Sequence, residues 1–249
     1  MRLLHVKTLK MRDFPKEPPL YAILPHTWGD EEVSLQEFAS DDRETKKGFA
    51  KIKGCCRQAH SDGLDWVWID TCCIDKTSSV ELSEVINSMY AWYRDSQVCY
   101  AFLDDIPTGH LVHVPGKFPN ARWFTRGWCL QELIAPSTVE FYAADWSEIG
   151  TKHSLADRIC NITRVPEKCC IAEEMSWASG RKTTRVEDEA FCLLGIFGVN
   201  MPMLYGEGQN AFFRLQEEML KHTEDYTFLL RHHYNRETKN HLELVRQGR

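Results

Sequence analysis

Residues 66–103 read WVWIDTCCIDKTSSVELSEVINSMYAWYRDSQVCYAFL and predict a strand, a helix and a second strand in succession. Trp66–Asp70 and Val98–Leu103 are short apolar runs, which are typical of buried strands. Between them, Ser78 with Glu81 three residues later is a capping-box pattern that predicts where the helix begins. The apolar face of that helix is formed by Leu82, Val85, Ile86, Met89, Tyr90 and Tyr93. Such a unit joins two parallel strands through a right-handed crossover.

The same alternation continues on both sides of this unit. Tyr21–Leu24 is predicted to be a strand, and a helix follows over Thr45–Ser61 and ends at Gly63. Downstream, a helix over Arg126–Ala135 leads to a strand over Val139–Tyr142. Strands that alternate with helices form a mainly parallel sheet with helices on its faces, so we expect an α/β fold.

The second half of the chain is predicted to be mainly helical, with helices over 154–162, 186–197 and 209–222. After residue 230 the sequence is polar and lacks periodicity. We therefore expect an α/β core over residues 1–150, a helical extension of the same domain over 151–230, and a polar tail or linker over 231–249.

Composition and charge disfavour several classes of protein. The 249 residues are 43% hydrophobic and 27% charged, as in a soluble globular protein, and the net charge of −6 disfavours nucleic acid or an anionic membrane as the partner. No apolar run approaches the roughly 20 residues of a membrane span, and the N-terminus lacks the features of a secretory signal. The ten cysteines show no zinc-binding spacing. We expect a cytoplasmic protein with mostly buried, free cysteines and no metal site.

Ligands of a parallel sheet bind outside the carboxyl ends of its strands. The residues that follow the predicted strands are His26–Asp30, Asp70–Lys76 and Asp104–Asp105. His26 is either an acid or base near neutral pH or a hydrogen-bonded structural group. The two adjacent aspartates either bind a divalent cation or are simply solvated, and solvation is the preferred interpretation.

Four segments together resemble the HET (heterokaryon incompatibility) domain of filamentous fungi: Tyr21–Gly29, Val67–Tyr100, Arg122–Pro136 and Arg185–Gly208. One departure is Pro25, where the family usually has a serine. The resemblance implies a role in incompatibility and programmed cell death. It also implies that the domain sits, as in many members, at the N-terminus of a larger receptor with a NACHT-type nucleotide-binding module.

The HET family is in turn distantly similar to Toll/interleukin-receptor (TIR) domains, which implies a TIR-like (flavodoxin-like) sheet and a link to innate immunity. The similarity involves Pro25–Asp30, Trp68–Asp70 and the stretch WCLQEL at Trp128–Leu133. In NAD-cleaving TIR domains, the glutamate of that last stretch is catalytic. The resemblance therefore implies a catalytic role for Glu132 and an NAD glycohydrolase activity.

The chemistry of NAD cleavage suits an acid beside an aromatic ring. Breaking the bond between nicotinamide and ribose places positive charge on the ribose, and a nearby carboxylate such as Glu132 stabilises that charge. Trp128 lies one turn earlier, so we expect it on the same helix face, where it would stack on nicotinamide. NAD is thus the expected substrate, and no prosthetic group is expected.

The other candidate residues for binding NAD each have two interpretations. Arg122 and Arg126 either bind its pyrophosphate or form surface salt bridges. The strand-end candidates are Trp28, Gly29, Asp30 and Asp70. Acidic residues at strand ends are also common as turn residues and helix caps, so a structural role is as well supported for the two aspartates as a binding role.

Two further motifs carry less weight. GEGQNA at Gly206–Ala211 matches a dinucleotide-binding fingerprint, but no predicted strand precedes it. A glycine turn before a helix is therefore favoured over a phosphate site. Cys129 suggests a cysteine peptidase, yet no histidine is marked as its partner.

Two functions remain open from the sequence. The first is an NAD-cleaving enzyme that is switched on by self-association and leads to cell death. The second is a non-catalytic adaptor that signals death by homotypic assembly. The same acidic and aromatic side chains suit an assembly surface as well as an active site.

Overall fold

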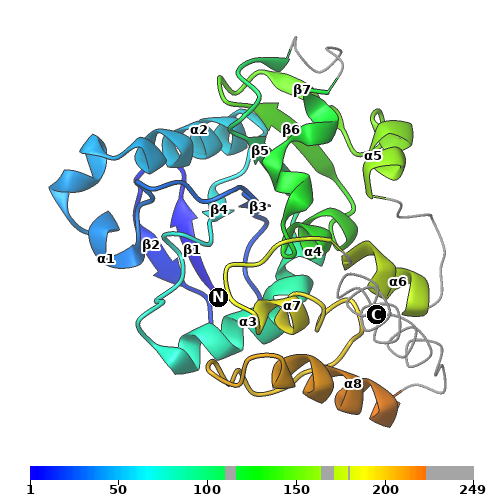
Figure 1. Ribbon diagram of the computed structural model, residues 1–249. Coiled ribbons are helices and arrows are strands. Elements are labelled where there is room, and N and C mark those ends of the chain that lie inside the picture. Colours follow the sequence, from blue (N-terminus) through cyan, green and yellow to red (C-terminus); the bar gives the residue numbers. More distant parts are fainter. Residues whose placement is uncertain (110–115, 164–170, 179, 223–249) are drawn as a thin grey trace.

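The computed structural model describes residues 1–109, 116–163, 171–178 and 180–222. Its strands form one mixed sheet in the order β2-β1-β4-β3-β5-β6-β7 (Figure 1). The strands are β1 (Arg2–His5), β2 (Met11–Asp13), β3 (Ala22–Ile23), β4 (Trp66–Trp68), β5 (Val98–Leu103), β6 (Val139–Ala143) and β7 (Glu148–Thr151).

The centre of the sheet is parallel, as the sequence predicts. β3 pairs in parallel with β4 on one side and with β5 on the other, and β5 pairs in parallel with β6. Taken in chain order, these four strands lie 2-1-3-4, the order of flavodoxin-like sheets. The strand order therefore reverses between β3 and β5, and ligands of such folds bind at that point.

Three antiparallel strands at the edges were not predicted. β1 and β2 pair as a hairpin beside β4, and β7 pairs with β6. Each has at most four residues, and neither β2 nor β7 has a buried residue. A strand this short and this polar leaves no apolar run and no clear alternation in the sequence.

The helices are α1 (Leu35–Phe38), α2 (Lys47–Ser61), α3 (Ser79–Arg94), α4 (Cys129–Ile134), α5 (Ala156–Thr163), α6 (Ile171–Ala178), α7 (Asp188–Phe191) and α8 (Asn210–His222). α2 covers one face of the sheet, and α3 and α4 cover the other (Figure 1). The chain passes through α2 from β3 to β4, on one side of β3, and then through α3 from β4 to β5, on the other side of β3. Because both crossovers are right-handed and run in opposite directions along the sheet, their helices lie on opposite faces.

At the start of α3, one of the two hydrogen bonds of the predicted capping box is present. The Ser78 hydroxyl accepts the backbone N–H of Glu81, as predicted. The Glu81 carboxylate does not reach back to the cap; it accepts the backbone N–H of Asp75 and pairs with Arg2 at 2.9 Å. α3 is thereby tied to β1 and to the loop after β4.

The C-terminal elements pack on α3 and α4 through a second hydrophobic cluster. Ile86 of α3 and Leu130 of α4 lie in this cluster together with Phe191, Leu194 and Leu215. The Asn87 side-chain amide adds two hydrogen bonds to the backbone of Met201. It donates to the Met201 carbonyl and accepts the Met201 N–H, both at 3.2 Å. The region after residue 180 is thus fastened to the helices of the parallel sheet.

The helix predicted over 186–197 is too long. α7 ends at Phe191, and a series of turns follows as far as Gly198, whose φ is +64°. Gly195 within these turns faces Tyr90 closely. The apolar spacing of the segment thus reflects burial against α3 rather than a continuous helix. The tail over 231–249 lies outside the described residues, and no helix in the described ranges is long and apolar enough to cross a membrane.

Candidate functional site

A cavity of about 370 Å³ opens where the strand order reverses. Its lining is Thr27, Trp28, Arg122, Thr125, Arg126, Lys182, Thr183 and Thr184. Thr27 and Trp28 come directly after the bridge between His26 and Phe102, which extends the pairing of β3 with β5. The cavity therefore lies at the carboxyl edge of the sheet, where the sequence predicts a ligand. It contains three of the predicted binding residues: Trp28, Arg122 and Arg126.

Asp104 and Asp105 position one wall of this cavity. Asp104 accepts the Thr27 hydroxyl at 2.7 Å and pairs with the Arg122 guanidinium. Asp105 accepts the Arg122 backbone N–H at 2.7 Å. The interpretation that Asp104 and Asp105 are simply solvated is therefore wrong, because both carboxylates bind Arg122. Among the described residues, no group of acidic, His and Cys side chains suits a metal ion.

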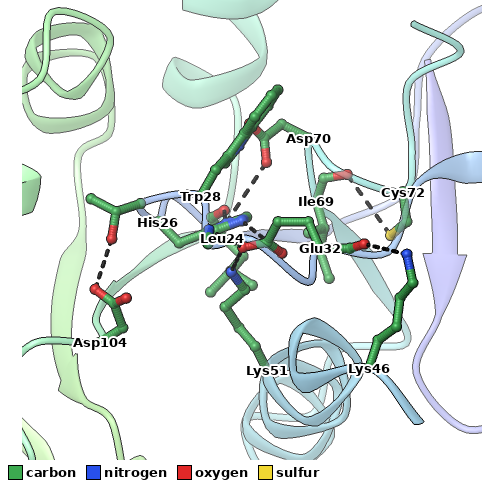
Figure 2. Close-up of polar contacts among 12 residues, drawn as sticks. Leu24, His26, Trp28, Glu32, Lys46, Lys51, Ile69, Asp70, Cys72 and Asp104 are labelled. Carbon is green, nitrogen blue, oxygen red and sulfur yellow. Dashed lines mark hydrogen bonds and ion pairs between the residues drawn. The ribbon is translucent and has the colours of Figure 1, made fainter. Parts of the chain in front are cut away.

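Trp28 is held at the mouth of the cavity from two sides. Its indole N–H donates to Asp70 Oδ2 at 2.8 Å (Figure 2), and the Lys76 ammonium lies 3.4 Å from the ring centroid. The Trp28 side chain nevertheless remains 43% exposed. Asp70 thus acts on the cavity through Trp28. Gly29 and Asp30 lie in the exposed turn that follows and do not line the cavity.

His26 belongs to a buried charged network beneath Trp28 (Figure 2). Its Nδ1 lies 3.2 Å from the Leu24 carbonyl, and its Nε2 lies 3.8 Å from Glu32 Oε2. Burial would raise the pKa of Glu32, but His26 and the Lys51 ammonium lower it to about 2. Because the His26 side chain is fully buried, it has no access to a ligand, and the structural interpretation is favoured.

Glu132 is buried inside the core. Its side chain accepts the Trp123 indole N–H at 2.8 Å and the Tyr93 hydroxyl at 3.4 Å. Burial raises the pKa of Glu132, and the charge of Asp70 adds to the effect, so that it reaches about 7. Cys129, Arg126 and Trp123 act in the opposite direction without cancelling it. Glu132 does not line the cavity, whereas Arg126, which stabilises its ionised form, does.

The aromatic partner of Glu132 is Trp123, and the expected pairing with Trp128 is wrong. The Trp128 side chain bonds to Asp188 and packs in the second hydrophobic cluster. One turn separates Trp128 from Glu132, but Trp128 precedes α4 and projects toward the C-terminal elements. Trp123 comes instead from a 3-10 turn over Arg122–Thr125. Its sequence separation of nine from Glu132 gives no helical signal.

The buried Glu132 predicts a dependence of stability on pH. A carboxyl with a pKa near 4.5 when unfolded and about 7 when folded favours the native state below pH 4.5, and this contribution is lost as the pH rises through 7. We expect this group to lower the free energy of unfolding of the wild type by about 3 kcal/mol between pH 4.5 and 8, and we expect Glu132→Gln to lack this decrease. Urea unfolding of both proteins at pH 5 and pH 8 measures this. Parallel changes in the two proteins would contradict it.

The weaker motifs have structural explanations. The backbone N–H groups of Gly206 and Gly208 both donate to Glu187 Oε1, at 2.8 and 3.0 Å, so the glycine turn already holds a carboxylate of the chain itself. Burial raises the pKa of the Cys129 thiol well above its usual value, and the charge of Glu132 raises it further. This environment disfavours a thiolate nucleophile.

The wall formed by Lys182–Thr184 was not predicted from the sequence. This segment comes from the C-terminal extension and lies beside Arg126, to which Lys182 is paired in a parallel β-bridge. A lysine followed by two threonines carries no periodic or motif signal. Only the fold brings it to the carboxyl edge of the sheet.

Comparisons with known proteins point to one family. Residues 21–110 match the family described as heterokaryon incompatibility protein (HET). The chain is 44% identical over 229 residues to the vegetative incompatibility protein HET-E-1 of Podospora anserina. That match covers 84% of the chain but only 17% of the relative, so the chain spans a small part of that protein's length. No solved structure gives a significant match.

Proposed function

The chain belongs to the heterokaryon incompatibility (HET) family, and we propose that it is a cytoplasmic effector of fungal incompatibility whose activity leads to programmed cell death. The name of its relative, a vegetative incompatibility protein, supports this role. Because the chain corresponds to 17% of that relative, we propose that it works as the effector part of a larger receptor. A NACHT-type nucleotide-binding module in the same or a partner chain would then control its assembly.

The activity we propose is cleavage of NAD. Water adds to the anomeric carbon of the ribose, the bond to nicotinamide breaks, and ADP-ribose, nicotinamide and a proton are released. The observation that carries the proposal is the cavity at the reversal of strand order, which is lined by Arg122, Arg126 and Lys182, with the buried Glu132 within electrostatic reach of Arg126. The cations suit the pyrophosphate, Trp28 offers a partly exposed ring for stacking, and the carboxylate suits the charge on the ribose.

Because Glu132 is buried, it must change conformation before it can act, and we propose that self-association causes this change. With its carboxyl held by Trp123 and Tyr93, Glu132 is out of reach of a ligand in the cavity. We assign this conformation to the resting monomer. Self-association would release the carboxyl toward the cavity. The ionised form would then be favoured by Arg126 and by the positive charge that develops on the ribose.

Clustering is expected to switch nicotinamide release on. The full chain, fused to a domain that dimerises on addition of a small molecule, is incubated with NAD before and after clustering, and nicotinamide is measured by chromatography. We expect release only after clustering. We also expect the rate to rise between pH 6 and pH 8, because burial raises the pKa of Glu132 to about 7 in the resting conformation and only the ionised carboxyl is proposed to leave that site and act. No release under any clustering condition would reject the enzyme.

A second candidate function is a non-catalytic adaptor that acts by homotypic assembly. The observation that favours it is a set of exposed apolar side chains on the C-terminal elements: Val186, Leu204, Phe213 and Leu220. Phe213 and Leu220 are seven residues apart on α8, so both lie on one side of that helix. Cell death that persists in Glu132→Gln would favour the adaptor, because that substitution leaves this surface intact.

A further inference from the structure

The C-terminal extension supplies one wall of the cavity. Lys182 donates its backbone N–H to the Thr125 carbonyl at 2.7 Å and accepts the Gly127 N–H at 3.0 Å. These two bonds join Lys182–Thr184 to the segment that carries Arg126. The cavity is therefore not complete within the parallel sheet and its crossover helices.

Arg181 and Gly127 hold this wall in place. The Arg181 guanidinium donates to the carbonyls of Phe124 and Arg126, at 2.8 and 3.1 Å, and to that of Trp177 at 2.8 Å. A Cβ at Gly127 would come within 2.7 Å of Thr183 Cγ2 and 3.0 Å of Cys192 Sγ, so a larger residue would force these side chains or the two segments to move. Lys182 thus projects from a backbone fixed on both sides.

The charges of the cavity are not all neutralised. Arg122 is paired with Asp104. Within the described part of the chain, Arg126 and Lys182 form no salt bridge, although Glu132 lies near enough to interact with Arg126. The hydroxyls of Thr27 and Thr125 donate within the protein, to Asp104 and to the Arg122 carbonyl, so the two cations dominate what the cavity offers to an anion.

We propose that Arg126 and Lys182 form a diphosphate-binding site in which Lys182, from the C-terminal extension, is a specificity-determining residue. The proposal rests on the proposed function, in which a dinucleotide enters this cavity. Two cations on paired segments suit two linked phosphate groups better than a single carboxylate. The ligands of this class are free pyrophosphate, nucleoside diphosphates and dinucleotides.

Binding is measured on the full chain by calorimetry, without clustering, so that no turnover is needed. The ligands are adenosine, pyrophosphate, ADP and ADP-ribose. We expect ADP to bind at least about tenfold more tightly than adenosine. Tighter binding of ADP-ribose than of ADP would identify a ligand with a ribose on each side of the diphosphate, as a dinucleotide has, and equal binding of pyrophosphate and ADP would identify the diphosphate alone. Adenosine that binds as tightly as ADP would overturn the proposal.

Lys182→Ala is the decisive variant, because its backbone can still make both bonds to the neighbouring segment. We expect it to weaken ADP binding at least about tenfold and Lys182→Arg to restore most of the affinity. Lys221→Ala, on the exposed surface of α8, is the matched control and is expected to bind as the wild type does. Unchanged affinity in Lys182→Ala would overturn the proposal even if clustered protein cleaves NAD. Diphosphate binding without any cleavage would instead reject the proposed enzyme alone.

Discussion

Glu132→Gln is expected to lower nicotinamide release from the clustered chain by roughly a hundredfold or more, the effect of removing one electrostatic contact to a charged transition state. Glutamine keeps the shape of the side chain and an oxygen that can accept the Trp123 indole N–H, but it carries no charge. Rates at saturating NAD, measured on folded and equally clustered protein, test this. Glu84→Gln, an exposed position on α3, is the matched control and is expected to leave the rate unchanged.

Glutamine is preferable to alanine at this position because of what surrounds the carboxyl. Glu132→Ala would leave the Trp123 indole N–H buried without an acceptor, which costs about 1–3 kcal/mol, and would also open a cavity in the core. A loss of activity in that variant would be ambiguous. Full activity in folded Glu132→Gln, in contrast, would remove Glu132 from the mechanism.

The second large effect is expected at Gly195, where α3 meets the C-terminal turns. A Cβ at this position would lie 2.0 Å from Tyr90 Cβ. The clash involves the root of the Tyr90 side chain, so no change of rotamer relieves it, and the segment and α3 must move apart. We expect Gly195→Ala to destabilise the chain by about 1–3 kcal/mol, the usual cost of overpacking, or more.

Urea unfolding measures this effect, with Gly29→Ala as the control. At Gly29 the nearest atom to an added Cβ is Glu32 Oε1 at 3.8 Å, an ordinary contact. We expect the unfolding midpoint of Gly195→Ala to fall and that of Gly29→Ala to stay near the wild-type value. A wild-type midpoint in Gly195→Ala would show that the C-terminal turns do not pack on α3 as described.

The parallel part of the fold could be predicted because its elements leave strong local signals. Val98–Leu103 is buried at every position, and the sequence predicts its limits without error. Ser78 marks the start of α3 through a cap that the structure contains. The edge strands and the shape of 186–197 could not be predicted, because long-range pairing and the contact of Gly195 with Tyr90 decide them.

The candidate site was predicted in its position but not in its internal contacts. Strand ends pointed to Trp28, the family resemblance pointed to Glu132, and the chemistry of pyrophosphate binding pointed to Arg122 and Arg126. The partners Trp123 and Lys182 were missed because neither lies at helical or strand spacing from the residue it serves. Their closeness to Glu132 and Arg126 comes from turns and from an extension that crosses back to the sheet.

The most direct test of NAD cleavage in this cavity is to locate NAD bound to clustered Glu132→Gln protein, in which turnover is expected to be slow, by crystallography or electron microscopy. We expect the diphosphate to lie beside Arg126 and Lys182 and nicotinamide to lie near Trp28. We also expect the side chain at position 132 to have left Trp123 and to contact the ribose. NAD bound outside this cavity, or a ribose out of reach of position 132 in the assembled state, would contradict it.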